Sequence, residues 1–305
     1  MVATLTLDLK DSRKYKDKER ALVQSYLILL TEAFNQIFKK SILRELRFTG
    51  GDELQGLFSD PECAFLCLRL FQRMLFSIPF HAGIGIGEWS TIIEDKDTFY
   101  QDGTAFQRAR TAIDKAKKDS ENTALICSET QKDPIFNALL NCCFLLINKN
   151  TQYQNELGLI LECSFPIQPY EKLDLNILLK LPVIMKKHAP AYVMNQSSEN
   201  DSFTDKDNQN INGENYKQIS PLLKLCKPIP IFTSSDSSLD TLVYQNSHPF
   251  GAASKLAEFI DLKRQNIDSA LRKSDIYTER SLAIALKNVL HSFASDITYA
   301  KEADK

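Results

Sequence analysis

The sequence has almost no net charge and no long apolar run. Its 37 Lys and Arg residues nearly balance 39 Asp and Glu residues, giving a formal charge of −2. A chain with so little overall charge has no global attraction to nucleic acid, so any DNA contact must come from a local basic patch. The longest apolar stretch, around residues 139–147, is far too short to span a bilayer, and no basic leader opens the chain. We therefore expect a soluble, cytoplasmic protein without a membrane partner.

Spacings typical of metal-binding cysteine motifs are also missing. None of the seven cysteines forms a Cys-x-x-Cys pair, which argues against a zinc site. We expect them to be reduced residues of the core, as in most cytosolic proteins. The four histidines are scattered along the chain, so the sequence assigns none of them a catalytic role: His81, His188, His248 and His291.

The composition is that of an ordinary globular protein, with 43% hydrophobic and 25% charged residues, and the length allows two domains. Regular secondary-structure signals fill residues 1–128, which we expect to form the first domain. Residues 129–194 are predicted to be a helical middle segment. Residues 195–218 contain almost no large apolar side chains, which is typical of a flexible linker or insertion. Residues 219–305 are predicted to form a helical C-terminal region.

Within residues 1–128 the pattern alternates between strands and helices. Strands are predicted at 4–9, 45–49, 54–58, 80–87 and 123–127, and helices at 22–38, 62–76 and 103–118. This order is of the β-α-β-β-α-β type, completed by a further helix and strand, and it is that of an α+β palm, a ferredoxin-like fold with a mostly antiparallel sheet and helices on one face. Glycines alternate in 80–87, which indicates that another backbone or a ligand approaches that strand closely.

Two acidic positions stand where such a fold would bring them together. Asp8 lies near the end of the first strand, and Asp52 follows two glycines at the predicted hairpin turn, with Glu53 next to it. Nucleotidyl transfer needs hard cations such as Mg²⁺ or Mn²⁺, which take carboxylate ligands. Asp8 and Asp52 are thus candidate metal ligands. The alternative is a solvated turn in which Asp only makes local hydrogen bonds.

Three segments, in order, resemble the diguanylate cyclase (GGDEF) family. They are Arg-Phe-Thr-Gly-Gly-Asp-Glu-Leu at 47–54, the glycine-rich strand 80–87, and Arg-Ala-Arg-Thr-Ala-Ile-Asp-Lys-Ala-Lys at 108–117. The same segments are similar to class III nucleotide cyclases, which share the palm fold. The overall layout most resembles the SatD family, through Asp-x-x-x-Ser-Arg at 8–13, Gly-Asp-Glu-x-Gln-Gly at 51–56 and Asp-Gly-x-Ala-Phe-x-x-Ala-Arg at 102–110.

These resemblances imply specific roles. Asp8 and Asp52 would bind metal, Glu53 would be a ligand or general base, and Lys117 would contact phosphate. Gly50 and Gly51 would let the substrate approach the hairpin, and Arg110 matches an arginine of the class III helix motif. The chain departs from class III enzymes at Phe48 and Phe106, and it lacks the guanine-reading segment of diguanylate cyclases. Base and product therefore stay open.

A basic run follows the first strand. Arg13 is the member of this run that we expect to contact triphosphate oxygens, although runs of this kind also form solvated loops.

Near the C-terminus, residues 253–273 have the apolar spacing of a helix-turn-helix motif. The exposed face of its second helix would carry the candidate DNA-binding residues Lys263, Arg264, Gln265 and Asn266. A plain helical hairpin that packs on the palm or on another chain explains the same spacing.

The sequence thus favours a metal-dependent nucleotidyl transferase or cyclase that converts nucleoside triphosphates into a cyclic or linear nucleotide signal. A homodimer is expected, since related palms complete their sites between two subunits. The alternative is a non-catalytic, SatD-like DNA-binding regulator whose palm binds a nucleotide or mediates dimerisation. A scaffold with neither activity is a third possibility.

Overall fold

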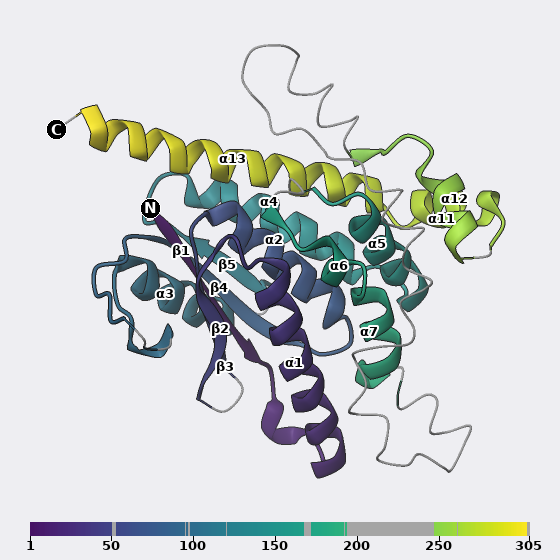
Figure 1. Ribbon diagram of the computed structural model, residues 1–305, viewed down its shortest axis with the longest axis horizontal. Helices are drawn as coiled ribbons and strands as arrows, with labels where there is room; N and C mark the ends of the chain where they lie inside the picture. The colour runs from purple at the N-terminus through teal and green to yellow at the C-terminus, as the bar shows by residue number, and fades with distance from the viewer. Residues whose placement is uncertain are drawn as a thin grey trace.

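The computed structural model describes residues 1–50, 53–94, 96, 98–119, 121–167, 172–191, 193, 247–260 and 262–303 (Figure 1). The predicted linker at 195–218 lies outside these ranges, as do Gly51 and Asp52 of the hairpin turn.

A five-stranded mixed sheet forms the N-terminal part of the protein. Its strands lie in the order β2-β3-β1-β4-β5, and every neighbouring pair is antiparallel except β4 and β5. The central strand β1 pairs with β3 on one side and with β4 on the other. The predicted strand and helix order is confirmed, with the strands at Val2–Leu9 (β1), Ile42–Gly50 (β2), Glu53–Phe58 (β3), Phe80–Gly87 (β4) and Ala124–Cys127 (β5).

Helices cover both faces of this sheet. Leu5 and Leu7 of β1 belong to the same hydrophobic core as buried residues of α1 (Asp17–Ile37) and α2 (Pro61–Met74). Successive side chains of a strand point to opposite faces, so Thr6 and Asp8 face the other way. That second face is covered by α3 (Thr104–Lys118). The expectation that helices lie on one face only is therefore wrong, because α3 crosses from β4 to the parallel strand β5 on the opposite side.

The contact between α3 and the sheet is unusually close. A Cβ atom added to Gly85 would run into the backbone of Ala105 and Ala109, and one added to Gly83 would meet the backbone of Ala109 and Ile113. The alternating glycines of β4 therefore mark the close approach of another backbone, as their spacing predicts. Small alanines on the helix complete the interface, and they too are fully buried.

Further helices pack around this α/β unit. α4 (Asp133–Asn148) contacts β5, and the long α13 (Ile276–Ala303) packs along α4 and α2. Figure 1 shows α13 crossing one side of the protein. Its buried Leu286 and Leu290 belong to the same hydrophobic core as the sheet. The remaining elements are Ser12–Lys14 (η1), Thr98–Tyr100 (η2), Gln152–Ser164 (α5), Leu175–Leu178 (α6), Leu181–His188 (α7), Ala252–Ile260 (α11) and Arg264–Lys273 (α12).

The structure bears on two features of the composition, the apolar helices and the cysteines. Among the helices that the structure describes, none combines the length and the apolar character needed to cross a bilayer. Five of the six described cysteines are buried, as predicted. Cys142 is exposed, because it lies on the outer side of α4 while its neighbour Cys143 faces the core.

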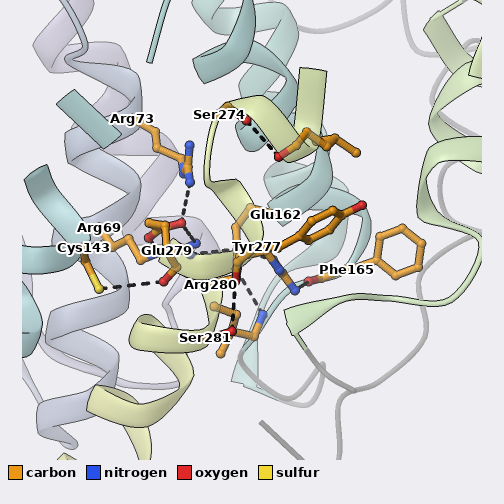
Figure 2. A network of polar contacts seen from close by, with 12 residues as sticks. Arg69, Arg73, Cys143, Glu162, Phe165, Ser274, Tyr277, Glu279, Arg280 and Ser281 are labelled. Carbon is orange, nitrogen blue, oxygen red and sulfur yellow. Dashed lines mark hydrogen bonds and ion pairs between the residues drawn. The ribbon is translucent and has the colours of Figure 1, made fainter. Parts of the chain in front are cut away.

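A buried network of charges joins α2, α5 and α13 (Figure 2). Arg69 donates two hydrogen bonds to Glu279, at 2.6 and 2.8 Å, and also contacts Glu162 at 2.8 Å. Arg73 contacts Glu279 at 2.6 Å, and Arg280 binds Glu162. All five side chains are at most 6% exposed. Three arginines thus share two glutamates, which leaves one surplus positive charge.

We expect Gly85→Ala to lower the free energy of unfolding by about 1–3 kcal/mol, because the new methyl group forces α3 away from β4. Gly56→Ala is the matched control: its methyl group meets backbone only at 3.2 Å, from Leu46, whereas that of Gly85→Ala meets backbone at 2.0 Å, so its cost should be smaller. Urea denaturation of both variants measures the difference. Equal losses of unfolding free energy in the two variants would show that the close contact between α3 and β4 does not require glycine at position 85.

We expect Glu279→Gln to lower the free energy of unfolding by about 3–5 kcal/mol, because it leaves three buried arginines with a single counter-charge. Arg73→Met should cost less, since the four remaining charges balance. Two nitrogens of Arg73 also have no hydrogen-bond partner among the described residues. A larger loss in Arg73→Met would contradict this account.

The pH dependence of unfolding tests the same network. Burial alone would raise the pKa of Glu279, but Arg69 and Arg73 outweigh it and hold this pKa at about 2, below the ordinary value of 4.5. The ion pairs therefore contribute fully above about pH 4.5, and their contribution is lost as the pH falls towards 2. Glu279→Gln should flatten this part of the profile.

Candidate functional site

The candidate site lies at the end of the sheet where β1 finishes. Asp8 stands opposite Glu53 of β3 on one side and opposite His81 of β4 on the other. Paired residues of antiparallel strands have Cα atoms about 4.5–5.5 Å apart, so these three side chains start from neighbouring positions. Gly50 ends β2 and pairs with Glu53, so the predicted pairing of the two hairpin strands is confirmed, and Glu53 at the start of β3 lies beside Asp8.

Helix α3 brings two cations to this sheet end. The Lys117 ammonium lies 2.7 Å from Oδ2 of Asp8. Arg110 donates two hydrogen bonds, of 2.9 and 3.0 Å, to the two carboxylate oxygens of Glu53. The two cations are seven residues apart, which is close to two helical turns and places them on one side of α3. Two predicted phosphate-binding residues thus meet two predicted catalytic carboxylates.

This cluster is open to solvent, unlike the buried network. The side chains of Asp8 and Lys117 are 22% and 33% exposed, and that of Arg110 is 55% exposed. Ion pairs exposed to this degree typically contribute about 0–1 kcal/mol, because water and salt screen them. The charges at the sheet end therefore do little for stability and are accessible to a charged ligand.

His81 belongs to the site although its sequence context suggested no role. Desolvation lowers its pKa, and the positive charges of Lys10 and Lys117 lower it further, which keeps the imidazole neutral at neutral pH. Its Nδ1 is buried and has no hydrogen-bond partner among the described residues. The available sequence signal was strand alternation, because His81 shares a face with the alternating glycines that pack against α3.

The donor chemistry of the site suits a hard cation. Carboxylate oxygens are the ligands that Mg²⁺ and Mn²⁺ prefer, and Asp8 and Glu53 supply two carboxylates from paired positions of β1 and β3. Within the described ranges, no three His, Cys, Asp or Glu side chains form a metal-binding group. Both described carboxylates already contact a cation, so a metal ion at Asp8 or Glu53 would compete with Lys117 or Arg110 for them.

Other predicted positions are less closely tied to this cluster. Arg13 lies in the short helix η1 directly after β1, and its side chain is outside the described part. Phe106, which replaces a class III asparagine, is 7% exposed and packs into the protein. Phe48, at the end of β2, is 39% exposed.

The candidate DNA-binding residues lie elsewhere. Lys263 caps the N-terminal end of α12, and Arg264, Gln265 and Asn266 form its exposed first turn. On the other side of α12, Ile267 and Leu271 pack against Leu256 of α11 and Leu161 of α5. Figure 1 shows α11 and α12 at the opposite end of the protein from α3.

Comparison with known proteins identifies the family. Residues 3–174, more than half of the chain, match the family model described as the SatD family. The chain belongs to the SatD family. No curated protein and no solved structure matches it. The family match covers the whole sheet and α3, including both carboxylate–cation pairs, whereas α11, α12 and α13 lie outside it.

We expect Asp8→Asn to change the free energy of unfolding by less than about 1 kcal/mol, because its ion pair with Lys117 is partly exposed. Chemical denaturation, run beside Glu279→Gln, measures this contrast within one protein. A loss of several kcal/mol in Asp8→Asn would mean that the pair at the sheet end is structural.

Proposed function

We propose that this SatD-family protein is a metal-dependent nucleotidyl transferase or cyclase that acts on nucleoside triphosphates. The product would be a cyclic or linear nucleotide signal. The observation that carries the proposal is the pair of partly exposed carboxylate–cation contacts, Asp8 with Lys117 and Glu53 with Arg110, next to a glycine hairpin. Carboxylates for metal and cations for phosphate are the two charge types that phosphoryl transfer requires.

The strand order supports a palm-type domain. Around the central β1, the order β2-β3-β1-β4 together with α1 and α2 is the arrangement of the ferredoxin-like β-α-β-β-α-β unit. In this arrangement the end of β1 and the β2–β3 turn share one edge of the sheet. The proposal thus assigns Asp8 and Asp52 to the same metal site.

Binding of a metal–nucleotide complex would exchange the partners of the four charges. Asp8 and Asp52 would hold Mg²⁺ or Mn²⁺, with Glu53 as a further ligand or general base. Lys117 and Arg110, released from their carboxylates, would take the phosphate oxygens, together with Arg13. The cation would neutralise phosphate charge during the transfer. Gly50 and Gly51 would allow the substrate to approach the hairpin backbone.

A homodimer belongs to the same proposal. Arg110 is more than half exposed, so the site has an open side beside the hairpin. A second copy of the chain would cover this side and complete the site.

The test is to incubate the purified protein with each nucleoside triphosphate and Mg²⁺ or Mn²⁺, and to analyse the products by mass spectrometry. Asp8→Asn and Asp52→Ala should each lower the rate at least about 10- to 100-fold, the cost known even for residues that only orient metal ligands. Asp296→Asn, at an exposed position on α13, is the matched control and should retain activity. Identical product traces from the wild type and Asp52→Ala would refute catalysis on these substrates.

A second candidate is DNA binding by α12, in a regulator whose palm only binds nucleotide or mediates dimerisation. It is supported by the consecutive exposed residues Lys263, Arg264, Gln265 and Asn266 at the start of that helix. This candidate predicts DNA binding that weakens with salt, and weakens further when Lys263 and Arg264 are changed to Gln. Fluorescence anisotropy at low salt measures it, and the absence of any change on adding DNA would refute it.

A further inference from the structure

A cavity of about 270 Å³ lies at the same end of the sheet as Asp8. One wall is the mostly apolar segment 75–80, which leads from α2 into β4. Its other lining includes six polar or charged side chains: Lys10, Gln72, His81, Asp119, Asn122 and Asn148.

Several residues that line this cavity are close neighbours of the residues of the candidate site. Lys10 follows Asp8 by two residues, and His81 is the residue that pairs with Asp8 in the sheet. Asp119 follows Lys117 by two residues at the end of α3. A ligand held by Asp8 and Lys117 would therefore have this cavity directly beside it.

Gln72 gives the cavity an unused hydrogen-bond acceptor. Its side chain comes from α2 and is only 6% exposed. The amide nitrogen donates to Oδ1 of Asn148 over 2.6 Å, which fixes the orientation of the group. The buried Oε1 then has no hydrogen-bond partner among the described residues. Buried polar atoms are nearly always paired, so an unpaired acceptor in a cavity wall indicates a ligand that donates a hydrogen bond.

Size and charge limit what this ligand is. The volume lies just below the range of roughly 300–1,000 Å³ that holds complete drug-sized ligands, so it suits one ring system. Lys10 and Asp119 carry opposite charges, so these two side chains together add no net charge to the lining. The cavity is thus suited to a neutral, planar group with an apolar surface and a polar edge. Side-chain amides of Gln and Asn recognise such edges in nucleobases.

We propose that this cavity binds the nucleobase of the substrate, and that Oε1 of Gln72 accepts a hydrogen bond from an exocyclic amino group of that base. The placing of the phosphates at Asp8 and Lys117 rests on the proposed function. The preferred base is then adenine, guanine or cytosine, each of which carries an amino group, and not uracil or hypoxanthine.

The test is calorimetric titration of the full chain with ATP, GTP, CTP, UTP and ITP in Mg²⁺, and with the corresponding nucleosides. The tightest triphosphate should carry an amino group, and Gln72→Leu should weaken it about five- to tenfold, the effect of losing one hydrogen bond. Gln72→Leu should bind this triphosphate no more tightly than it binds UTP or ITP. Gln36→Leu, an exposed position on α1, is the matched control and should bind as the wild type.

A second variant guards against misfolding of Gln72→Leu. Asn148 is exposed, so Asn148→Ala should fold normally, and it removes the partner that orients Gln72. Asn148→Ala should also weaken the binding of the preferred triphosphate. Unchanged affinities in both variants, or tightest binding of UTP or ITP, would overturn the proposal for the cavity.

The outcomes separate this proposal from the function on which it rests. Triphosphates that bind through Asp8 with equal affinity for every base would overturn the cavity proposal and leave the proposed function intact. Nucleoside binding that is lost in Gln72→Leu, without any effect of Mg²⁺ or of Asp8→Asn, would support the cavity and refute the metal site. Absence of binding by every probe would overturn both.

Discussion

The close contact between the glycine side of β4 and the backbone of α3 is the constraint on which the candidate site depends. Because Gly83 and Gly85 have no side chains, the helix lies directly on the sheet. Only at this short distance do Lys117 and Arg110 reach across to Asp8 and Glu53 on the neighbouring strands. The glycines of β4 thus determine where Lys117 and Arg110 lie relative to the carboxylates.

The protein contains two charge clusters of opposite character. The arginines and glutamates of α2, α5 and α13 are withdrawn from water and form ion pairs with one another, so they help to determine how the helices pack. The four charges at the sheet end remain hydrated and can change partners at low cost. Burial, more than residue type, therefore distinguishes the charges that hold the fold from those that are available to a ligand.

Local patterns in the sequence predicted much of this fold. The alternating apolar residues of β1 and the glycine pair before Asp52 gave the strands and the hairpin, since these signals depend on neighbours in the chain. The face on which α3 lies depends on β5 pairing in parallel with β4, which the local patterns did not indicate, and the prediction was wrong there. The ion pairs of Glu279 had no local signal, because its partners lie in other elements. His81 was missed although strand alternation places it on the same face as the glycines of β4. The roles of Asp8 and Asp52 in catalysis remain predictions.

The bond between Arg69 and Glu279 joins residues that are 210 positions apart. At a synthesis rate of roughly 5–20 residues per second, α2 leaves the ribosome about 10–40 seconds before α13 can supply the counter-charge. During that interval two arginines on a helix destined for the core have no glutamate from α13 to pair with, and water is the better solvent for them. Arg69 can already pair with Glu162 once α5 has been made, whereas the contact between Arg73 and Glu279 forms only when α13 arrives.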